Sequence, residues 1–197
     1  MKKENKVIFN PNTIEFTTVA AETCGFLEKV EQFNRDEFVD KALKLLPLLY
    51  LKAQLIPTCE YIGDGYLENY TTEETYEVVR MSFAYLLAEK DDYLEVFLPD
   101  MQYSDTPIKK CISEDLADIY QDLKDFIFVF QLGLDETMND ALVRCKQNFE
   151  SYWGQRLVNT LRALHNVKYD TTNSSTNEDL FDDELGVSEF DNNFDLY

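Results

Sequence analysis

The sequence contains a single histidine, His165, among 197 residues. Di-iron helical bundles hold their metals through paired Glu-x-x-His motifs, so one histidine excludes that class. It also excludes zinc sites with two histidines, and it leaves only a Ser-His triad built on His165 itself. His165 is the one side chain expected to titrate near neutral pH, which makes it a candidate general base beside Arg162. A histidine near a helix C-terminus more often stabilises the helix dipole, and we favour that interpretation.

Cysteine pairs and long apolar runs are also missing. The four cysteines are far apart and form no Cys-x-x-Cys motif: Cys24, Cys59, Cys111 and Cys145. No apolar h-region follows the basic N-terminal residues, so we expect neither a signal peptide nor a disulfide framework. The longest apolar candidate, residues 43–56, is interrupted by charged residues and Pro47 and falls short of the ~20 residues that span a bilayer. We therefore expect a soluble, cytoplasmic protein.

Basic residues are scarce relative to acidic ones. The chain has 38 Asp and Glu against 18 Lys and Arg, a formal net charge of -20. This charge opposes binding to nucleic acid phosphates and anionic lipids, so we expect neither nucleic acid nor membrane as a partner. Residues 170–197 contain nine acidic residues and no Lys or Arg. We therefore divide the chain into a helical domain, residues 1–169, and an acidic tail, residues 170–197, whose composition predicts disorder.

Clean two-residue alternation is rare, whereas apolar residues recur at helical spacing along most of the chain. The pattern predicts an all-α fold, a bundle of five to seven helices closed by a long C-terminal antiparallel hairpin. We expect a kink or a break at Pro47, which removes a backbone hydrogen bond. Thr71 and Glu74 form a predicted capping box, and Ser113 and Asp135 are predicted N-caps. The expected helices span residues 11–30, 36–56, 71–90, 93–97, 113–133 and 135–167.

Residues 113–167 are the most informative stretch, because they form two amphipathic helices joined at Gly133-Leu134. An acidic stripe follows the first helix: Asp115, Asp118, Asp122 and Asp125. A basic and amide-rich stripe follows the second: Arg144, Asn148, Gln155, Asn159 and Arg162. Folding the chain back at the turn brings Arg144 near Asp122 and Arg156 near Glu114. We therefore expect the stripes to neutralise one another, at ~0.2–1 kcal/mol per exposed pair.

The second helix of this hairpin is predicted to be the longer, about 32 residues against about 20, so it should overhang its partner by roughly 18 Å. The overhang carries the candidate binding surface: Tyr152, Trp153, Gln155, Arg156, Arg162 and His165. Gly154 lies inside the helix, where glycine costs about 1 kcal/mol relative to alanine. Something therefore approaches the backbone closely there, and we favour another helix over a ligand.

Several of these segments resemble one bacterial family. The motifs are SEDLADIY at 113–120, YWGQR at 152–156, RALH at 162–165 and LLPLLYL at 45–51. They are similar to the hallmarks of domain of unknown function 5063, and the likeness spans most of residues 10–167. The resemblance implies an all-helical domain of this size without an established activity, so it transfers no functional residue to this chain.

One carboxylate pattern is relevant to metal binding. A Glu-Glu-x-x-Glu run at 73–77 and a later Glu-x-x-Asp at 89–92 resemble the Mg²⁺ cluster of all-α nucleotide pyrophosphohydrolases. The candidate ligands are Glu74, Glu77, Glu89 and Asp92. In one continuous helix Glu77 and Glu89 are about 18 Å apart, too far to share an ion. We favour solvated acids at the helix ends, and we expect no metal and no other cofactor.

The tail indicates a different kind of function. Its acids are interspersed with aromatic residues: Phe181, Phe190, Phe194 and Tyr197. Such a segment folds onto a basic groove of a partner, docks on its own domain's basic stripe, or simply keeps the protein soluble. We expect a non-enzymatic interaction module that binds another protein through the tail or the C-terminal helix. The alternative is a small-molecule or Mg²⁺-dependent enzyme that uses residues 152–156 with Arg162 and His165, or the carboxylates between 73 and 92.

Overall fold

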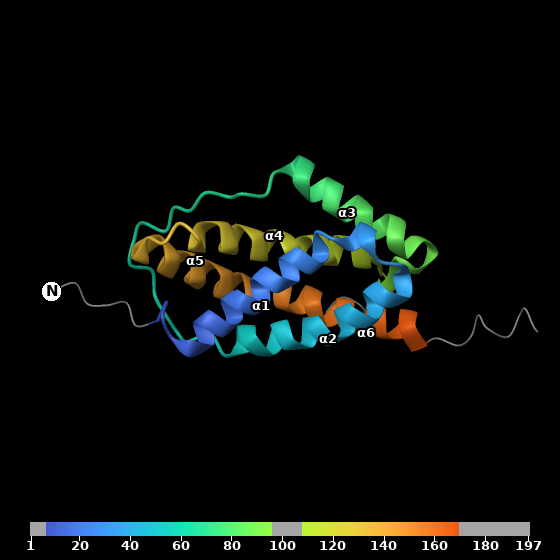
Figure 1. The fold of residues 1–197 in the computed structure, drawn as a ribbon, viewed down its shortest axis with the longest axis horizontal. Helices are drawn as coiled ribbons and strands as arrows, with labels where there is room; N and C mark the ends of the chain where they lie inside the picture. The colour runs from blue at the N-terminus through green and yellow to red at the C-terminus, as the bar shows by residue number, and fades with distance from the viewer. Residues whose placement is uncertain (1–6, 96–107, 170–197) are drawn as a thin grey trace, which may run out of the picture.

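A computed structural model describes residues 7–95 and 108–169, and it is mostly helical over that part of the chain (Figure 1). Its elements are α1 (Pro11–Leu27), η1 (Val30–Gln32), α2 (Arg35–Gln54), α3 (Glu73–Leu87), η2 (Ala88–Lys90), β1 (Asp92–Glu95), β2 (Ile108–Cys111), α4 (Ile112–Phe130), α5 (Asp135–Asn148), the π-helical turn η4 (Phe149–Trp153) and α6 (Gly154–Tyr169). Since η4 joins α5 directly to α6, the described residues form five long helices. The prediction of a mostly helical protein is confirmed, and the predicted disorder of the tail concerns residues outside the described part.

Four helices enclose the core. α1 packs against α2 and α4, and α6 packs against the same two helices, so the four segments form a closed ring. Fully buried side chains from each of them meet inside it: Phe16, Leu49, Leu123 and Leu164. α3 lies outside the ring, obliquely along α4 (Figure 1). No helix in the described residues combines the length and apolar character that a transmembrane span requires.

Helix α2 is continuous through Pro47, so of the predicted kink or break, the break is wrong. Proline inside a helix costs ~3 kcal/mol because it removes one backbone hydrogen bond and crowds the preceding turn. Pro47 lies on the exposed face, whereas Leu46 and Leu49 on either side are buried in the core. Burying two leucines contributes about 1.5–3 kcal/mol each, which outweighs the cost of the proline.

The capping box of α3 is shifted by one residue from the prediction. Thr72 and Thr75 form it: each side chain accepts a hydrogen bond from the other's backbone N–H. The predicted Thr71 donates its own N–H to Asp125 Oδ1 on α4, 2.8 Å away. Thr71 is thus held against α4 as the last residue of the connection, and the helix begins after it.

A two-stranded antiparallel hairpin, β1 with β2, departs from the predicted all-α fold. Residues 93–95, where a short helix was predicted, belong to strand β1, and residues 96–97 lie outside the described part. The burial pattern explains the error: Tyr93 and Glu95 are covered while Asp92 and Leu94 are exposed, an alternation of period two over only four residues. A run this short carries too little pattern to separate strand from helix.

The residue that directly precedes the hairpin caps helix α4. Ser113 was predicted to cap this helix, but α4 begins at Ile112 and Ser113 lies in its first turn. Asp91, just before β1, accepts the Ser113 N–H at 2.7 Å and the Ser113 hydroxyl at 2.6 Å. A carboxylate at a helix N-terminus satisfies open N–H groups and interacts favourably with the helix dipole. The predicted N-cap Asp135 is likewise wrong, because it is the first residue of α5 and Leu134 precedes it as the cap.

Residues 56–72, which we call the strap, run from α2 around the end of α5 and back along α4 to α3 (Figure 1). Side chains of α4 and α5 accept hydrogen bonds from backbone N–H groups of the strap. Asp140 accepts the N–H groups of Ile62 and Gly63 at 2.9 and 3.0 Å. A side-chain carbon at Gly63 would lie 2.6 Å from Asp140 Oδ2, so only glycine permits this approach. The strap is therefore fixed against α4 and α5 although it has no regular secondary structure.

Candidate functional site: the acidic row of α4 and the hollows beside it

The predicted acidic stripe of α4 faces its neighbours rather than solvent. We call these residues the acidic row: Asp115, Asp118, Asp122 and Asp125. Asp115 is fully buried, and Asp125 is 8% exposed. Burying a carboxylate is costly unless it is paired and hydrogen-bonded, so the partners of the row determine what it does chemically.

Arg156 of α6 joins the first two members of the row. Its Nη1 donates to Asp115 Oδ1 at 2.9 Å, and its Nε lies 3.5 Å from Asp118 Oδ2. The predicted neighbour of Arg156 was Glu114, one position away on α4, which is exposed. The same guanidinium contacts both Asp115 and Asp118, so one arginine serves two acids spaced three apart on one helix face.

Three tyrosines complete the partners of these two aspartates. Tyr93 donates its hydroxyl to Asp115 Oδ2 at 2.5 Å, while Tyr76 and Tyr152 donate to Asp118 at 2.9 and 2.7 Å. All four carboxylate oxygens therefore accept a bond from the protein itself. Burial and the neighbouring carboxylates raise the pKa of each tyrosine, so all three remain protonated donors. Burial raises the pKa of Asp115, and the bonds from Tyr93 and Arg156 oppose that rise.

The π-helical turn brings Tyr152 to the row. A π turn inserts one extra residue into a helix and changes the direction of the side chains that follow. The Gly154 N–H donates to the Phe149 carbonyl, five residues earlier. A Cβ at Gly154 would lie 2.4 Å from that same carbonyl oxygen, so the turn requires glycine. The close neighbour of Gly154 is thus its own helix, and both predicted causes, a second helix and a ligand, are replaced by this one.

The other half of the row borders a hollow between α4 and α5 of about 410 Å³, the Asp122 hollow. Asn148 donates to Asp122 Oδ1 at 2.5 Å. Burial raises the pKa of Asp122 to about 6, against the lowering effect of the Asn148 bond. Arg144 also lines this hollow, as predicted from the register, but it donates to Leu67 O and Asn69 of the strap. The stripes therefore compensate one another only in part.

A second hollow, of about 500 Å³, lies at the far end of α6, between that helix and the segment from η2 to β1. We call it the Arg162 hollow. Its described lining is Glu89, Lys90, Asp92, Tyr93, Leu94, Ile112, Arg162, Ala163, Asn166 and Val167. It therefore brings together Arg162 of the predicted binding surface and Glu89 and Asp92 of the alternative carboxylate set.

The remaining members of the predicted binding surface are separated by the fold. Trp153 is fully buried and donates its indole N–H to the Cys145 carbonyl at 3.2 Å. Gln155 donates to Asn159, which in turn donates to the buried Glu95 of β1 at 3.1 Å. His165 is exposed and contacts the ring of Tyr169, with centroids 4.6 Å apart. The predicted overhang does not project freely, because α2 packs along α6.

The alternative metal ligands are also spread apart. Glu77 forms an ion pair with Arg80, Glu89 with Arg35, and Asp92 with Lys109. Glu74 is exposed in the first turn of α3. In the part of the chain that the structure describes, no three His, Cys, Asp or Glu side chains are grouped so that they could hold a metal ion.

Sequence reasoning found the aspartates of the row and missed the residues that complete it. Tyr76 and Tyr93 were placed only within the expected helices 71–90 and 93–97, and Glu95 was not singled out. Their roles depend on where α3 and β1 pack against α4, which no local pattern encodes. The local signal was the spacing of the aspartates, which placed four acids along one flank of the helix beside its apolar face.

Fold and site together define a mostly helical domain whose row of carboxylates is hydrogen-bonded by the protein's own side chains. Residues 7–170 match the family model described as domain of unknown function 5063, and the chain belongs to this family, as its motifs predicted. Among solved structures it is similar to protein BF1032 from Bacteroides fragilis, with 64% sequence identity. That match covers 83% of this chain and 96% of the other, with a TM-score of 0.75. A comparison with curated proteins finds no match.

Proposed function

We propose that the protein is a non-enzymatic, cytoplasmic interaction module on a helical bundle, and that its Arg162 hollow binds an acidic, aromatic-bearing segment of another protein. The supporting observation is the composition of that hollow. Leu94 and Val167 supply its accessible apolar surface, because Leu94 is 56% exposed and Val167 half-buried, whereas Ile112 and Ala163 are buried beneath them. The volume of about 500 Å³ lies within the ~300–1,000 Å³ typical of ligand pockets.

Cationic side chains lie beside this apolar surface. Lys90 and Arg162 belong to the lining, and Lys110 stands opposite Tyr93 in the hairpin. Directly opposed residues of an antiparallel pair point to the same face of the sheet, so Lys110 lies on the face that Tyr93 presents. Among the described residues, neither Lys90 nor Lys110 forms an ion pair.

The two acids of the lining are each paired with a cation outside it. Glu89 is 2.6 Å from Arg35, and Asp92 is 2.6 Å from Lys109. The described lining holds two cations and two anions, so it is locally neutral in a chain whose net charge is -20. Such a site repels an acidic segment less than a negative surface does, and its lysine helps to orient the segment.

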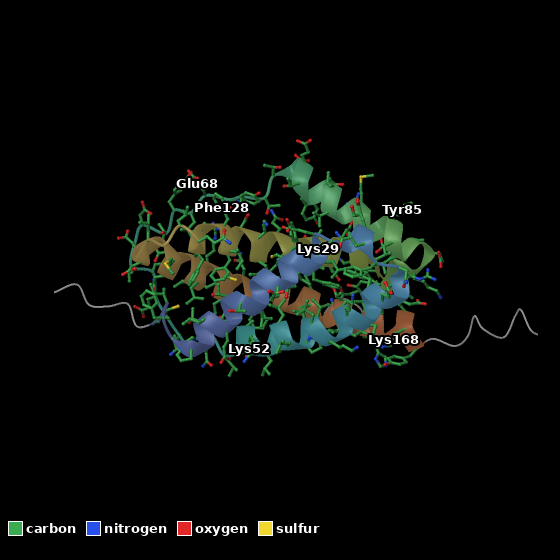
Figure 2. All side chains as sticks on the ribbon, in the orientation of Figure 1. Lys29, Lys52, Glu68, Tyr85, Phe128 and Lys168 are labelled. Carbon is green, nitrogen blue, oxygen red and sulfur yellow. The ribbon has the colours of Figure 1, made fainter. Side chains whose placement is uncertain are left out.

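A fluorescence anisotropy titration tests the proposal with the labelled probe peptide Glu-Glu-Leu-Phe-Glu-Asp-Leu at low ionic strength. Full-length protein should bind it, and Lys90→Glu should weaken binding about fivefold by reversing a charge beside the apolar surface. The matched control is Lys29→Glu, an exposed lysine outside the lining and apart from Lys168 at the α6 end (Figure 2).

A control variant and a second probe show whether the hollow itself binds the peptide. The control should bind like the unmodified protein, and a probe with serine in place of Leu and Phe should bind much more weakly. Equal weakening by Lys90→Glu and Lys29→Glu would show that overall charge alone attracts the peptide, and the assignment to the hollow would be wrong.

A second candidate function is favoured by the Asp122 hollow. A carboxylate with a pKa raised to about 6, in a hollow that also contains Arg144 and Tyr152, is the kind of group found at small-molecule sites. A thermal-shift screen with nucleotides and divalent metals tests it. A ligand that raises the melting temperature of the protein, but not that of Asp122→Asn, would support a small-molecule site or an enzyme over the interaction module.

A further inference from the structure

Resting on the proposed function, we infer that the resident occupant of the Arg162 hollow is residues 179–185 of this same chain, which a partner must displace. The sequence of this segment is DLFDDEL. It carries the features that the hollow matches: Leu180, Phe181 and Leu185 among four acidic residues. The protein is thus an interaction module that its own tail covers.

The position of the tail favours this occupant. Helix α6 ends at Tyr169, and Val167, two residues earlier, already lines the hollow. Figure 2 shows Lys168 at this end of the molecule. The connecting residues 170–178 number nine. A flexible linker of that length has a root-mean-square span of roughly 15–18 Å, so the segment starts at the edge of the hollow and reaches it without strain.

The chemistry of the segment also fits. Phe181 and Leu185 stand on either side of Asp182, Asp183 and Glu184, so one short run of sequence supplies both apolar and acidic groups. The apolar pair then contacts the surface around Leu94 and Val167. The acids lie beside Lys90, a lysine of the lining.

Two other hollows suit an acidic segment less well. The Asp122 hollow contains two aspartates of the row and one arginine, which itself bonds the strap. A third hollow, between η1 and α3, has an apolar lining with the exposed Met81 and Tyr85, but its only charged lining residue among those described is Glu31. Like charges at both places repel residues 179–185, so the Arg162 hollow is the favoured one.

Tethering makes a weak contact effective. A short flexible linker gives the tail an effective concentration of ~1 mM at the hollow. For an intrinsic dissociation constant on the order of 100 µM, the tail then occupies the hollow about ten times as often as it leaves it free. A peptide added in solution competes with the tail, and its apparent affinity falls by about tenfold.

Full-length variants and the same probe peptide test this inference. Leu180→Ser, Phe181→Ser and Leu185→Ser together remove the apolar contacts and leave the charge of the tail unchanged. The control carries Val187→Ser, Phe190→Ser and Phe194→Ser, an equal number of apolar losses farther along the tail. The first variant should bind the probe about tenfold more tightly than the unmodified protein, and the control should match the unmodified protein. Hydrogen exchange at Tyr93–Leu94 and at Asn166–Val167 should be faster in the first variant alone.

The outcomes separate this inference from the proposed function. Tight probe binding that is equal in the unmodified protein and the first variant would overturn occupation by the tail and leave the interaction module in place. No probe binding in either protein would overturn the proposed function, and the inference with it. An effect of equal size in the control would remove the assignment to residues 179–185. A tenfold difference that grows with protein concentration would show that the tail comes from a second copy, which would overturn docking within one chain.

Discussion

Gly154→Ala and Gly25→Ala are the same substitution in two helices, and the structure predicts opposite effects. At Gly25, in the interior of α1, an added Cβ has no neighbour within 4 Å. At Gly154 it would lie 2.4 Å from the Phe149 carbonyl oxygen and 2.9 Å from the Phe149 ring. The carbonyl oxygen belongs to the backbone of the π turn, so it cannot move away unless the turn itself opens.

The magnitudes follow from these two environments. Alanine is favoured over glycine in a helix by ~0.5–1 kcal/mol, so Gly25→Ala should stabilise the protein by about that amount. Gly154→Ala has the same intrinsic gain, but overpacking costs ~1–3 kcal/mol, and a backbone contact this short belongs at the upper end. The net effect at Gly154 is a loss of about 1–2 kcal/mol, so the two variants differ by roughly 2–3 kcal/mol.

Thermal unfolding and urea denaturation of the full-length variants measure this difference. In a protein of this size, 1 kcal/mol changes the melting temperature by about 2–4 °C, so Gly25→Ala should melt higher and Gly154→Ala lower than the unmodified protein. If both variants gained stability equally, the π turn would not require glycine, and our explanation of how Tyr152 reaches Asp118 would be refuted.

Three further predictions concern buried carboxylates. Asp122→Asn should stabilise the protein by about 3 kcal/mol at pH 7.5 and by little at pH 4, because the pKa of Asp122 is about 6 in the folded state and ~3.9 in the unfolded chain, so the cost of its ionisation develops between about pH 4 and pH 6. A gain in urea denaturation that is the same at both pH values would contradict this. Arg156→Met should lower the free energy of unfolding by about 3 kcal/mol, because it leaves Asp115 buried without its cation. In a double-mutant cycle, adding Asp115→Asn to Arg156→Met should restore most of that stability, whereas additive losses would mean that the pair is not coupled. Asp91→Ala should lower the free energy of unfolding by about 1–2 kcal/mol and speed amide hydrogen exchange at Ser113, because the Ser113 N–H loses its acceptor. Unchanged exchange at Ser113 would show that Asp91 is not the cap of α4.

The parts of the fold that the sequence predicted are those decided by neighbours along the chain. Asn10 accepts the Asn12 N–H at 2.9 Å ahead of Pro11, a helix start readable from two residues. Gly133 has a φ of 71°, and it marks the turn between α4 and α5 that its position indicated. The aspartates at intervals of three and four on α4 likewise share one face, as their spacing requires.

The missed features depend on contacts between distant residues. Asp91 caps α4 from 22 positions earlier, so the local capping rule assigned Ser113 instead. Thr71 has the residue type of a cap, but its amide is bonded to Asp125, 54 positions later. The π turn has almost no signal in the sequence apart from Gly154. At Ser113 and Thr71 a tertiary partner accepted the backbone N–H that local rules assign to a neighbour in sequence.

The acidic row explains why we place the function beside it rather than within it. A nucleophile or metal ligand needs an oxygen that is open to the reacting partner, yet Asp115 and Asp118 accept bonds at every carboxylate oxygen from Arg156 and three tyrosines. These bonds join α3, β1 and α6 to α4, so the row fixes how those elements are placed. Tyr93 takes part in the row and also lines the Arg162 hollow. The row therefore holds one wall of the hollow in position, and a preformed wall lowers the ordering cost of any binding there.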